Sequence, residues 1–506
     1  MHRPLIRAKG NSCARPESAD GHDEPRQRET SVMSANTEIA HRAGKRRRGM
    51  SRQTLAIVGG GASGTLTAAH LLRLAHGTWR VVLIDRSSHG PGIAYATRDH
   101  QHLLNVPAGL MSAFDDDANH LVRWCRERGR ATGEHEYLPR QLYGAYLRNL
   151  LVEPADGGDV ELVQDEVVGL NDAVSHGHMV VALRSGRCIP ADAVVVAIGN
   201  PLPARLAAVR AGRRVINDPW NPESLDRIRG AGHVVVVGTG LTAVDIAQTA
   251  TIGGTTVFAI SRHGELPRVH KAAGRPTPTP PLVLGTDVVD LAGVLQAVGG
   301  ALLANPSEWR GVVDSLRPLT PNLWQALSLD DRRTFLREFK WLWDLHRHRL
   351  APPVGAQIEN LRSLGRLQVA SARIVAARST PSNVAVCIEQ DGEQRELTAD
   401  WLINATGPAG NIANVPDLFI GQLLASGLAR PDELGIGFAC ARNGALLGAG
   451  SADHRRLFTL GPPRRGELLE SNAIPEIRAQ AAHIAETLVA DLETRTPGRA
   501  AQALAG

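Results

Sequence analysis

The chain of 506 residues has few cysteines, and no two of them are close together in the sequence. There is no C-x-x-C or C-x-x-x-x-C pair, so the sequence predicts no structural zinc site and no metal site of that kind. A flavin disulfide reductase needs a close redox pair, and this class is excluded as well. Scattered thiols are typical of a reducing compartment, and we expect a cytoplasmic protein. The five cysteines are Cys13, Cys125, Cys188, Cys387 and Cys440.

Long apolar runs and an excess of charge are also missing from the main part of the chain. No run approaches the roughly 18 apolar residues that a membrane span needs, so we expect none. The formal charge of +5 arises in residues 1–50, which hold 11 Lys and Arg against 6 Asp and Glu, whereas the rest holds 45 of each. The main part is therefore neutral, and we expect no nucleic-acid partner.

Residues 1–50 form a polar tail that ends in a basic run at 45–48 and has no apolar core of a secretory signal. One interpretation is a basic arm that binds nucleic acid or a membrane surface. The composition favours a disordered extension, or sequence upstream of another start at Met33 or Met50.

The most informative feature is a glycine turn between an apolar strand and a helix. Residues 55–58 are apolar, Gly59, Gly61 and Gly64 follow, and residues 65–72 predict a helix. In the dinucleotide fingerprint these glycines allow a sharp turn, close approach of a pyrophosphate, and close packing of the helix on the strand. The N-terminus of the helix then presents unpaired N–H groups to the phosphates.

The next predicted strand, at residues 80–84, ends on Asp85, about 20 residues past the last glycine. An acid at this place accepts hydrogen bonds from the hydroxyl groups of a ribose. Strand, turn, helix and acid together predict a site for an adenine dinucleotide rather than a plain glycine-rich loop.

A second fingerprint follows the apolar residues 234–237 and contains Gly238 and Gly240. The strand after it ends on Ser261 and Arg262 instead of an acid. These side chains can hydrogen-bond and neutralise a 2′-phosphate, so the site is expected to take NADPH, with NADH less favoured. The alternative is that Arg262 is a solvated charge at the end of a strand.

Three later segments belong with these turns. Two further apolar strands end in glycine turns, at Gly199 and at Gly407. A third strand ends before Gly461, and a helix is predicted from Ile474 to about residue 488. The N-terminus of that helix can face the pyrimidine edge of a flavin, where negative charge develops on reduction.

Two fingerprints, each followed by a later strand with a glycine turn, indicate one dinucleotide-binding domain inserted into another. We expect an α/β protein with two Rossmann-like domains of the glutathione-reductase type, the NAD(P) domain lying within the FAD domain. The expected parts are a disordered basic tail at 1–50, an FAD-binding domain at 51–205 and 400–490, an NAD(P)-binding domain at 206–399 with a helical insert at 285–352, and a flexible C-terminus at 491–506.

Helices are predicted in the insert over residues 287–303 and 330–350. The second ends in a basic segment with His346, His348 and Arg349. Two histidines two residues apart point to different faces of a helix, which is poor geometry for a metal. These residues are interpreted either as basic groups beside the helix C-terminus or as contacts to a substrate or nicotinamide.

Several short motifs are shared with one known family. They lie at residues 92–95, 102–108, 111–112, 218–220, 238–242, 261–264, 266–268, 343–352, 461–466 and 474–478. Together they resemble a bacterial FAD/NAD(P)-binding family, which includes FAD-dependent urate hydroxylase and the nitrosuccinate-forming aspartate N-monooxygenase. The resemblance covers about residues 52–490, and it implies a flavin monooxygenase without naming a substrate. The F-x-G-x-x-x-H motif of flavin-containing and Baeyer–Villiger monooxygenases is missing from residues 217–224.

The leading hypothesis is an FAD-dependent, NAD(P)H-consuming monooxygenase. It would hydroxylate a small polar substrate, an amine, amino acid or purine-like ring, with O2 through a C4a-hydroperoxyflavin. One alternative is an NAD(P)H oxidoreductase that passes electrons to a quinone or protein, and another is a non-catalytic flavin-binding partner. The sequence does not indicate an oligomeric state.

Asn105 is the first candidate for a flavin or substrate contact, because its loop should fold over the flavin; the alternative is a side chain that stabilises the loop. Arg268, His346 and Arg349 are candidates for anchoring an anionic substrate or the nicotinamide. The predicted cofactor-binding residues are Gly59, Gly61, Ala62, Ser63, Gly64, Asp85, Arg86, Asn105, Val106, Gly199, Gly238, Gly240, Leu241, Thr242, Ser261, Arg262, Gly407, Gly461 and Ile474.

Overall fold

The structure, a computed structural model, describes residues 52–503 apart from residues 174–177, 211, 272–289, 305 and 451–452. The basic tail predicted at residues 1–50 lies outside the described residues. Within the described residues, none of the helices combines the length and the apolar character that crossing a membrane requires.

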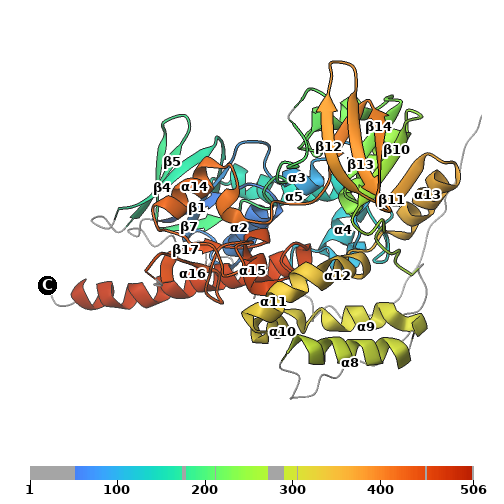
Figure 1. The fold of residues 1–506 in the computed structure, drawn as a ribbon. Coiled ribbons are helices and arrows are strands. Elements are labelled where there is room, and N and C mark those ends of the chain that lie inside the picture. The colour runs from blue at the N-terminus through green and yellow to red at the C-terminus, as the bar shows by residue number, and fades with distance from the viewer. Residues whose placement is uncertain are drawn as a thin grey trace, which may run out of the picture. The chain divides into compact units, whose positions relative to one another are not determined.

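A six-stranded sheet combines strands from two distant parts of the chain (Figure 1). Its order is β16-β17-β7-β1-β2-β3, and all neighbours are parallel except β16 and β17. The bounds are β1 Gln53–Val58, β2 Trp79–Asp85, β3 Val160–Gln164, β7 Ala193–Val196, β16 Ala445–Leu447 and β17 Asp453–Thr459. In β1 the apolar residues alternate between two buried clusters, because Leu55 and Ile57 lie in one and Ala56 and Val58 in the other.

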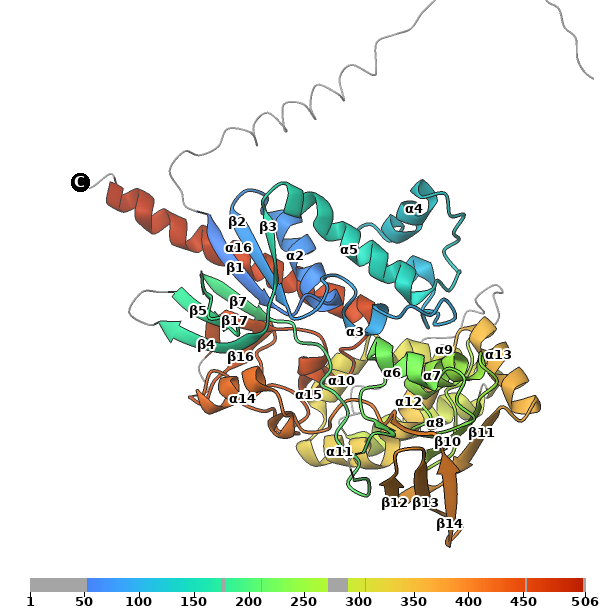
Figure 2. The same ribbon diagram turned by 90° about the horizontal axis from the view of Figure 1, so that it is seen from above.

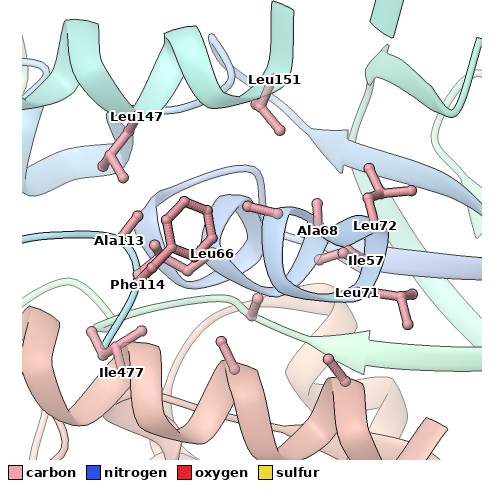
Figure 3. Packing of buried hydrophobic residues seen from close by; sticks show 14 of the residues in the cluster. Ile57, Leu66, Ala68, Leu71, Leu72, Ala113, Phe114, Leu147, Leu151 and Ile477 are labelled. Atoms are coloured by element: carbon pink, nitrogen blue, oxygen red, sulfur yellow. The ribbon is translucent and has the colours of Figure 1, made fainter. Parts of the chain in front are cut away.

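Three helices cover one face of this sheet: α2 Ala62–Leu74, α5 Arg140–Asp156 and α16 Ile474–Ala503 (Figure 2). Leu66 of α2, Leu147 of α5 and Ile477 of α16 share one apolar cluster, with α2 in the middle (Figure 3). The other face carries α14 Leu418–Ala425 and the antiparallel sheet of β4 Val167–Ala173, β5 His178–Leu183 and β6 Cys188–Ala191.

A five-stranded parallel sheet forms a second domain, with the order β11-β10-β9-β15-β8. All its strands fall between β7 and β16 in the sequence, so this domain is inserted into the first, as the fold class predicted. The bounds are β8 Val215–Ile216, β9 His233–Val237, β10 Thr256–Ser261, β11 Leu367–Ser371 and β15 Trp401–Asn404. The helices α6 Pro222–Ile228, α7 Leu241–Thr251 and α13 Pro352–Ser363 contribute to its core.

The strand at residues 401–404 corrects the predicted boundary at residue 400. We assigned residues 400–490 to the first domain, but β15 pairs with β9 and β8 in the second sheet. Without β15 the edge of β9 would be unpaired, and Leu402 and Ile403 would not complete the two apolar layers of that domain. The antiparallel sheet of β12 Arg373–Ser379, β13 Val384–Gln390 and β14 Glu393–Ala399 packs on the same strands.

The helical insert has α8 where the first helix is predicted, and several short helices where the second is predicted. The helix expected over 330–350 is divided between α11, the π-helical segment η3 and α12, and Ser328 caps the start of α11 by accepting from the Asp331 N–H. Of the helix expected over 287–303, residues 287–289 lie outside the described residues, and α8 begins at Leu291. The bounds are α8 Leu291–Ala304, η2 Pro306–Glu308, α9 Trp309–Leu316, α10 Thr320–Ala326, α11 Leu329–Thr334, η3 Phe335–Phe339 and α12 Lys340–Arg347.

Short helices lie in the segments that connect these parts. They are α3 Gly92–Tyr95, η1 Ala108–Leu110, α4 His120–Glu127, η4 Ile412–Asn414, η5 Pro462–Arg464 and α15 Arg465–Leu468. At the C-terminus, α16 continues to Ala503, so the described part of the segment predicted to be flexible from residue 491 is helical. Residues 485–496 are rich in Ala, Leu and Glu, which continue a helix.

The packing of α2 on β1 gives a first prediction. A Cβ atom at Gly64 would lie 2.0 Å from the backbone oxygen of Gly59. We therefore expect Gly64→Ala to lower the free energy of unfolding by roughly 1–3 kcal/mol, measured by denaturant unfolding. Gly299→Ala in α8 is the control, because its Cβ would meet no atom within 4 Å. Equal stability of the two variants would contradict the prediction.

Candidate functional site

The first glycine turn joins β1 to α2. Gly59 has a φ of 108°, and its N–H donates to the carbonyl of Ile84 at 2.8 Å. Gly61 is the N-cap residue of α2 and has no side-chain cap. The first N–H groups of α2 therefore lack a capping side chain and are available to an anion.

Asp85 at the end of β2 holds this turn in shape. Its Oδ2 accepts from the Gly60 N–H at 2.7 Å, and its Oδ1 accepts from the N–H and hydroxyl of Ser87 at 2.7 and 2.8 Å. Arg86, beside it, is exposed. Each carboxylate oxygen can accept two hydrogen bonds, so Asp85 retains capacity for a ribose hydroxyl.

Segments that are far apart in the sequence meet at the first turn of α2, which begins with Ala62 and Ser63. A Cβ atom on Gly61 would lie 3.2 Å from the Cα of Gly92. A Cβ atom on Gly461, after β17, would lie 2.7 Å from Ser63 Oγ. The segments around Gly61, Gly92 and Gly461 therefore lie next to one another at the N-terminus of α2.

Two further glycine turns of the first domain differ in how closely their surroundings hold the backbone. The N–H of Gly461 donates to Gln480 Oε1 at 2.9 Å, and its carbonyl accepts from the Ser471 hydroxyl at 2.6 Å. Gly199, after β7, has a φ of 68°, and a Cβ there would meet no atom within 4 Å. Ile474 begins α16 as predicted and is buried.

The second glycine turn repeats the geometry of the first. Gly240 caps α7 with φ −76° and ψ −169°, close to the φ −74° and ψ −164° of Gly61, and it too has no side-chain cap. A Cβ at Gly240 would meet no atom within 4 Å, so the space beside the helix N-terminus is open. Leu241 and Thr242 form the first turn of α7. Gly407, after β15, has a φ of 85° and also faces open space.

The end of β10 carries the residues expected to distinguish coenzymes. Ser261 Oγ accepts from Thr239 Oγ1 at 2.9 Å and from the Gly264 N–H at 3.0 Å, so this hydroxyl is tied to the glycine turn. Arg262 is exposed. The neighbouring His263 stacks on Trp341, with ring centroids 3.9 Å apart.

Residues 97–115, which we call the connecting loop, bind the first domain to α7 of the second. His102 is fully buried, and its Nδ1 lies 2.8 Å from Thr97 Oγ1. Its Nε2 lies 3.0 Å from the carbonyl of Asp245 and 2.9 Å from Thr249 Oγ1. Thr249 Oγ1 in turn donates to Asp99 Oδ2 at 2.6 Å. These contacts fix the loop against the helix that follows the second glycine turn.

A buried ion pair lies beside this network. Arg140 NH1 is 2.8 Å from Asp245 Oδ2, although the two are not aligned as a hydrogen bond. Arg140 Nε donates to the carbonyl of Leu103 at 3.1 Å, and the guanidinium lies over the ring of Trp220. Burial raises the pKa of Asp245, and the charges of Arg140 and His102 oppose that rise.

Asn105 lies in the connecting loop, where its backbone is fixed. Its carbonyl accepts from His270 Nε2 at 2.9 Å, while its side-chain amide has no hydrogen bond within the described part of the chain. Burial, reinforced by Arg349, lowers the pKa of His270 to about 4, so this imidazole is neutral at neutral pH. Val106 packs against the first apolar core.

Arg268, His346 and Arg349 lie close together, because residues 268–270 pair with residues 345–350. The exposed guanidinium of Arg268 is 3.6 Å from Glu265. His346 Nδ1 lies 2.9 Å from the carbonyl of Leu342 in its own helix.

Arg349 does not present the free guanidinium that we expected of a substrate anchor. It is 2% exposed, and its NH1 and NH2 donate to the two carboxylate oxygens of Asp314 at 3.0 and 2.9 Å. Its Nε donates to the carbonyl of His346 at 2.7 Å. A buried guanidinium is costly without hydrogen-bond partners, and those of Arg349 lie in α9 and at the end of α12. Arg349 therefore links these two helices and does not offer a free group to a substrate.

The sequence analysis missed His102, Arg140, Asp245 and His270 as candidates. Asp245 gave the clearest signal, since it is a charged residue in the otherwise apolar and small first turns of a helix. Its partner Arg140 could not be identified from the sequence, because the two residues meet only in the folded chain.

Glu470 connects α12 to the segment before α16. It is 8% exposed, and it accepts from Trp343 Nε1 at 2.7 Å and lies 3.5 Å from Arg347 and 3.9 Å from His348. Burial opposes its ionisation, but His348, Arg347 and Trp343 outweigh burial and hold the pKa of Glu470 at about 2.

Among the described residues, no group of three or more His, Cys, Asp or Glu side chains could hold a metal ion. The described cysteines are free thiols, of which two are buried. The donors that stand out are backbone N–H groups at two uncapped helix N-termini, with an acid after one turn and an arginine after the other. This donor set fits two ligands that each carry a pyrophosphate.

The comparisons with known proteins agree with this fold. The sequence model of a family described as FAD-NAD(P)-binding matches residues 56–201, which span the first glycine turn and β7. None of the curated proteins compared matches the sequence of the chain.

Several solved structures share the fold at low sequence identity. An ornithine hydroxylase from Pseudomonas aeruginosa, in its reduced form, is 14% identical with a TM-score of 0.62, over 87% of this chain and 100% of that one. An ornithine N-hydroxylase from Kutzneria sp. 744 is 16% identical with a TM-score of 0.59, over 88% and 100%. A bacillithiol disulfide reductase from Bacillus cereus is 14% identical with a TM-score of 0.52, over 87% and 100%.

The ionised state of Glu470 gives a second prediction. Its pKa of about 2 lies below the ordinary value of 4.5, so its charge stabilises the fold above pH 4.5, and this stabilisation is lost as the pH falls toward 2. We expect Glu470→Gln to lower the free energy of unfolding at pH 7 by up to about 3 kcal/mol and to flatten its pH dependence between 4.5 and 2.

The measurement is denaturant unfolding at a series of pH values. Glu486→Gln, an exposed acid on α16, is the control and should leave the curve unchanged. An E470Q curve with the slope of the unmodified protein would contradict the prediction.

Proposed function

We propose that the protein is an FAD-dependent, NADPH-consuming monooxygenase that hydroxylates a small amine or amino acid. The observation that carries the proposal is the pair of uncapped glycine turns with different residues after the next strand. Asp85 follows the first turn and suits a ribose diol, whereas Arg262 follows the second and suits a 2′-phosphate. One site would then hold a flavin permanently, and the other would take up the reductant.

The chain supplies positioning for this chemistry. Gly61, Ser63, Asp85 and the start of α16 would hold FAD, and the turn at Gly240 with Arg262 would hold NADPH. Bound flavin would accept two electrons from the coenzyme and pass them to O2. The connecting loop would exclude water from the reacting atoms, with Asn105 offering its unpaired amide to the flavin or the substrate.

Two observations support hydroxylation of an amine. The first two solved structures described above are of ornithine hydroxylases, one of them with reduced FAD, NADP+ and L-ornithine. A cadaverine monooxygenase from Erwinia amylovora, bound to FAD, has a TM-score of 0.58 at 13% identity, over 87% of this chain and 94% of that one.

The sequence motifs further support placement with the family that includes urate hydroxylase and the aspartate N-monooxygenase. The free thiols support a cytoplasmic location.

A second candidate function is an NADPH oxidoreductase that passes electrons to another acceptor. The bacillithiol disulfide reductase shares the fold with a TM-score of 0.52. The described cysteines are unpaired, so electrons would pass from the flavin directly to a quinone or protein acceptor and not through a redox disulfide of this chain.

The test of the function is the visible spectrum of the purified protein without oxygen. We expect flavin bands that NADPH bleaches faster than NADH. Admission of air with L-ornithine, cadaverine or L-aspartate should then give hydroxylated amine in proportion to NADPH oxidised. Bleaching with turnover of a quinone or protein acceptor but without hydroxylated product would favour the reductase, and a colourless protein after addition of FAD would refute both.

Arg262 gives a prediction on coenzyme choice. A lost charge-assisted hydrogen bond of about 1.5–3 kcal/mol corresponds to roughly 10- to 100-fold in affinity. We expect Arg262→Ala to raise the KM for NADPH by this factor and to leave the KM for NADH unchanged, measured by flavin reduction. Arg373→Ala, another exposed arginine, is the control. An equal effect on both coenzymes would show that Arg262 does not read the 2′-phosphate.

A further inference from the structure

Three of the four tyrosines in the chain lie in one aromatic cluster. Tyr143 and Tyr146 lie three residues apart on α5, are both fully buried, and have ring centroids 5.6 Å apart. Tyr95, at the end of α3, packs on Tyr143 at 4.8 Å, and Trp124 of α4 packs on Tyr146 at 5.5 Å. Phenol and indole rings are the side chains most easily oxidised by one electron. The four rings therefore form a continuous series of groups that can exchange an electron.

This aromatic cluster begins beside the first glycine turn. Tyr95 belongs to the same short helix as Gly92, whose Cα would lie 3.2 Å from a Cβ atom on Gly61. A Cβ atom on Gly144 would lie 2.5 Å from the carbonyl oxygen of Tyr95, so α3 is packed directly on the backbone of α5. The segment that borders the proposed cofactor site is thus joined to the buried tyrosines.

Tyr146 has a base for its phenolic proton. Its oxygen accepts from the Ala113 N–H at 3.1 Å and lies 2.7 Å from His120 Nδ1. Burial raises the pKa of Tyr146 and lowers the pKa of His120, where the charge of Asp117 opposes burial. With its hydrogen on Nε2, the neutral imidazole presents Nδ1 as the acceptor for the phenolic hydrogen.

The neighbouring buried rings lack such a base. Within the described residues, the hydroxyl of Tyr143 and the indole N–H of Trp124 are buried and have no hydrogen-bond partner. The guanidinium of Arg128 lies 4.4 Å from the ring centroid of Trp124, and its charge opposes a second positive charge on that ring. An oxidised Tyr143 or Trp124 would remain a buried cation, which is costly. Tyr146 can lose its proton together with the electron.

We propose that Tyr146 and His120 form a redox site that takes up one oxidising equivalent. A one-electron oxidant of the class of peroxide-derived radicals removes an electron from the phenol, the O–H bond breaks, and the proton passes to His120 Nδ1. The products are a neutral tyrosyl radical, an imidazolium and the oxidant reduced by one electron. Only the source of the oxidant rests on the proposed function, because reduced flavin that meets O2 without a substrate releases peroxide.

Pulse radiolysis of the full chain tests the site, with azide radicals as the one-electron oxidant of aromatic side chains. We expect the oxidation to end on a tyrosyl radical, detected by electron paramagnetic resonance after rapid freezing. Tyr146→Phe keeps the ring but has no phenolic proton, so it should lose this signal. Tyr137→Phe is the matched control, because Tyr137 is the tyrosine outside the cluster, and it should keep the signal. A signal that persists in Y146F or disappears in Y137F would overturn the proposal.

The variant His120→Gln separates proton transfer from hydrogen bonding. A glutamine amide can hydrogen-bond to Tyr146 but cannot take up its proton, so we expect H120Q to lose the tyrosyl signal as well. In the unmodified protein, D2O in place of H2O should change the line shape of the radical, because the hydrogen between its oxygen and His120 is exchanged. An undiminished signal in H120Q, or a line shape that D2O leaves unchanged, would overturn the proposal.

Thermal unfolding verifies that each variant is folded, and the D2O measurement on the unmodified protein keeps the test decisive if one is not. The outcome is separate from that of the function, because radiolysis requires neither coenzyme nor substrate. Loss of the signal in Y146F and H120Q, without any hydroxylated product in the unmodified protein, would support this site and refute the monooxygenase. Hydroxylation together with a signal that survives in Y146F would do the reverse.

Discussion

The fold depends on two glycines at which another segment of backbone lies too close to leave room for a side chain. A Cβ on Gly59 would lie 2.3 Å from the carbonyl oxygen of Ala197, and one on Gly238 would lie 2.2 Å from that of Ala405. In both domains the first glycine of the turn is thus pressed against the residue that follows the later strand, β7 or β15. The two domains share one construction, which explains why β15 belongs to the second sheet. Each helix N-terminus lacks a capping side chain because its N-cap residue is itself a glycine, Gly61 or Gly240, and it is therefore open to an anion.

The connecting loop is held by contacts to helices of both domains. Its buried His102 and the Arg140–Asp245 pair fasten it to α7, the helix whose N-terminus would receive the coenzyme. On its other side, Arg478 of α16 donates to the carbonyl of Ser112 at 2.9 Å. A displacement of α7 or α16 would therefore shift the connecting loop, which is expected to cover the reacting atoms. Buried polar contacts suit this task, since they are specific in direction and costly to break.

The sequence alone predicts those features of the fold that depend only on neighbouring residues. The turn at Gly59, the alternation of β1 between two cores and the start of α16 at Ile474 all follow from neighbouring residues and elementary geometry. The neighbour of a strand in a sheet does not, because the short, mostly apolar strand at residues 401–404 fits either sheet, and only the gap between β9 and β8 selects one. The same holds for the buried ion pair of Arg140 and Asp245, whose members are separated by about a hundred residues.

Arg349 shows why charge alone is a poor guide to binding residues. Its sequence context, a basic helix end, suggested an anion site, yet every nitrogen of its guanidinium donates within the protein. Glu470 is committed in the same way to Trp343, Arg347 and His348. Such groups cannot take up a ligand without leaving a buried charge unpaired, which costs more than a surface contact returns. Within the described residues the side chain of exposed Arg262, beside the second turn, has no such partner and stays free to contact another molecule. Incomplete pairing of a charged group is therefore a better guide to a ligand contact than the charge itself.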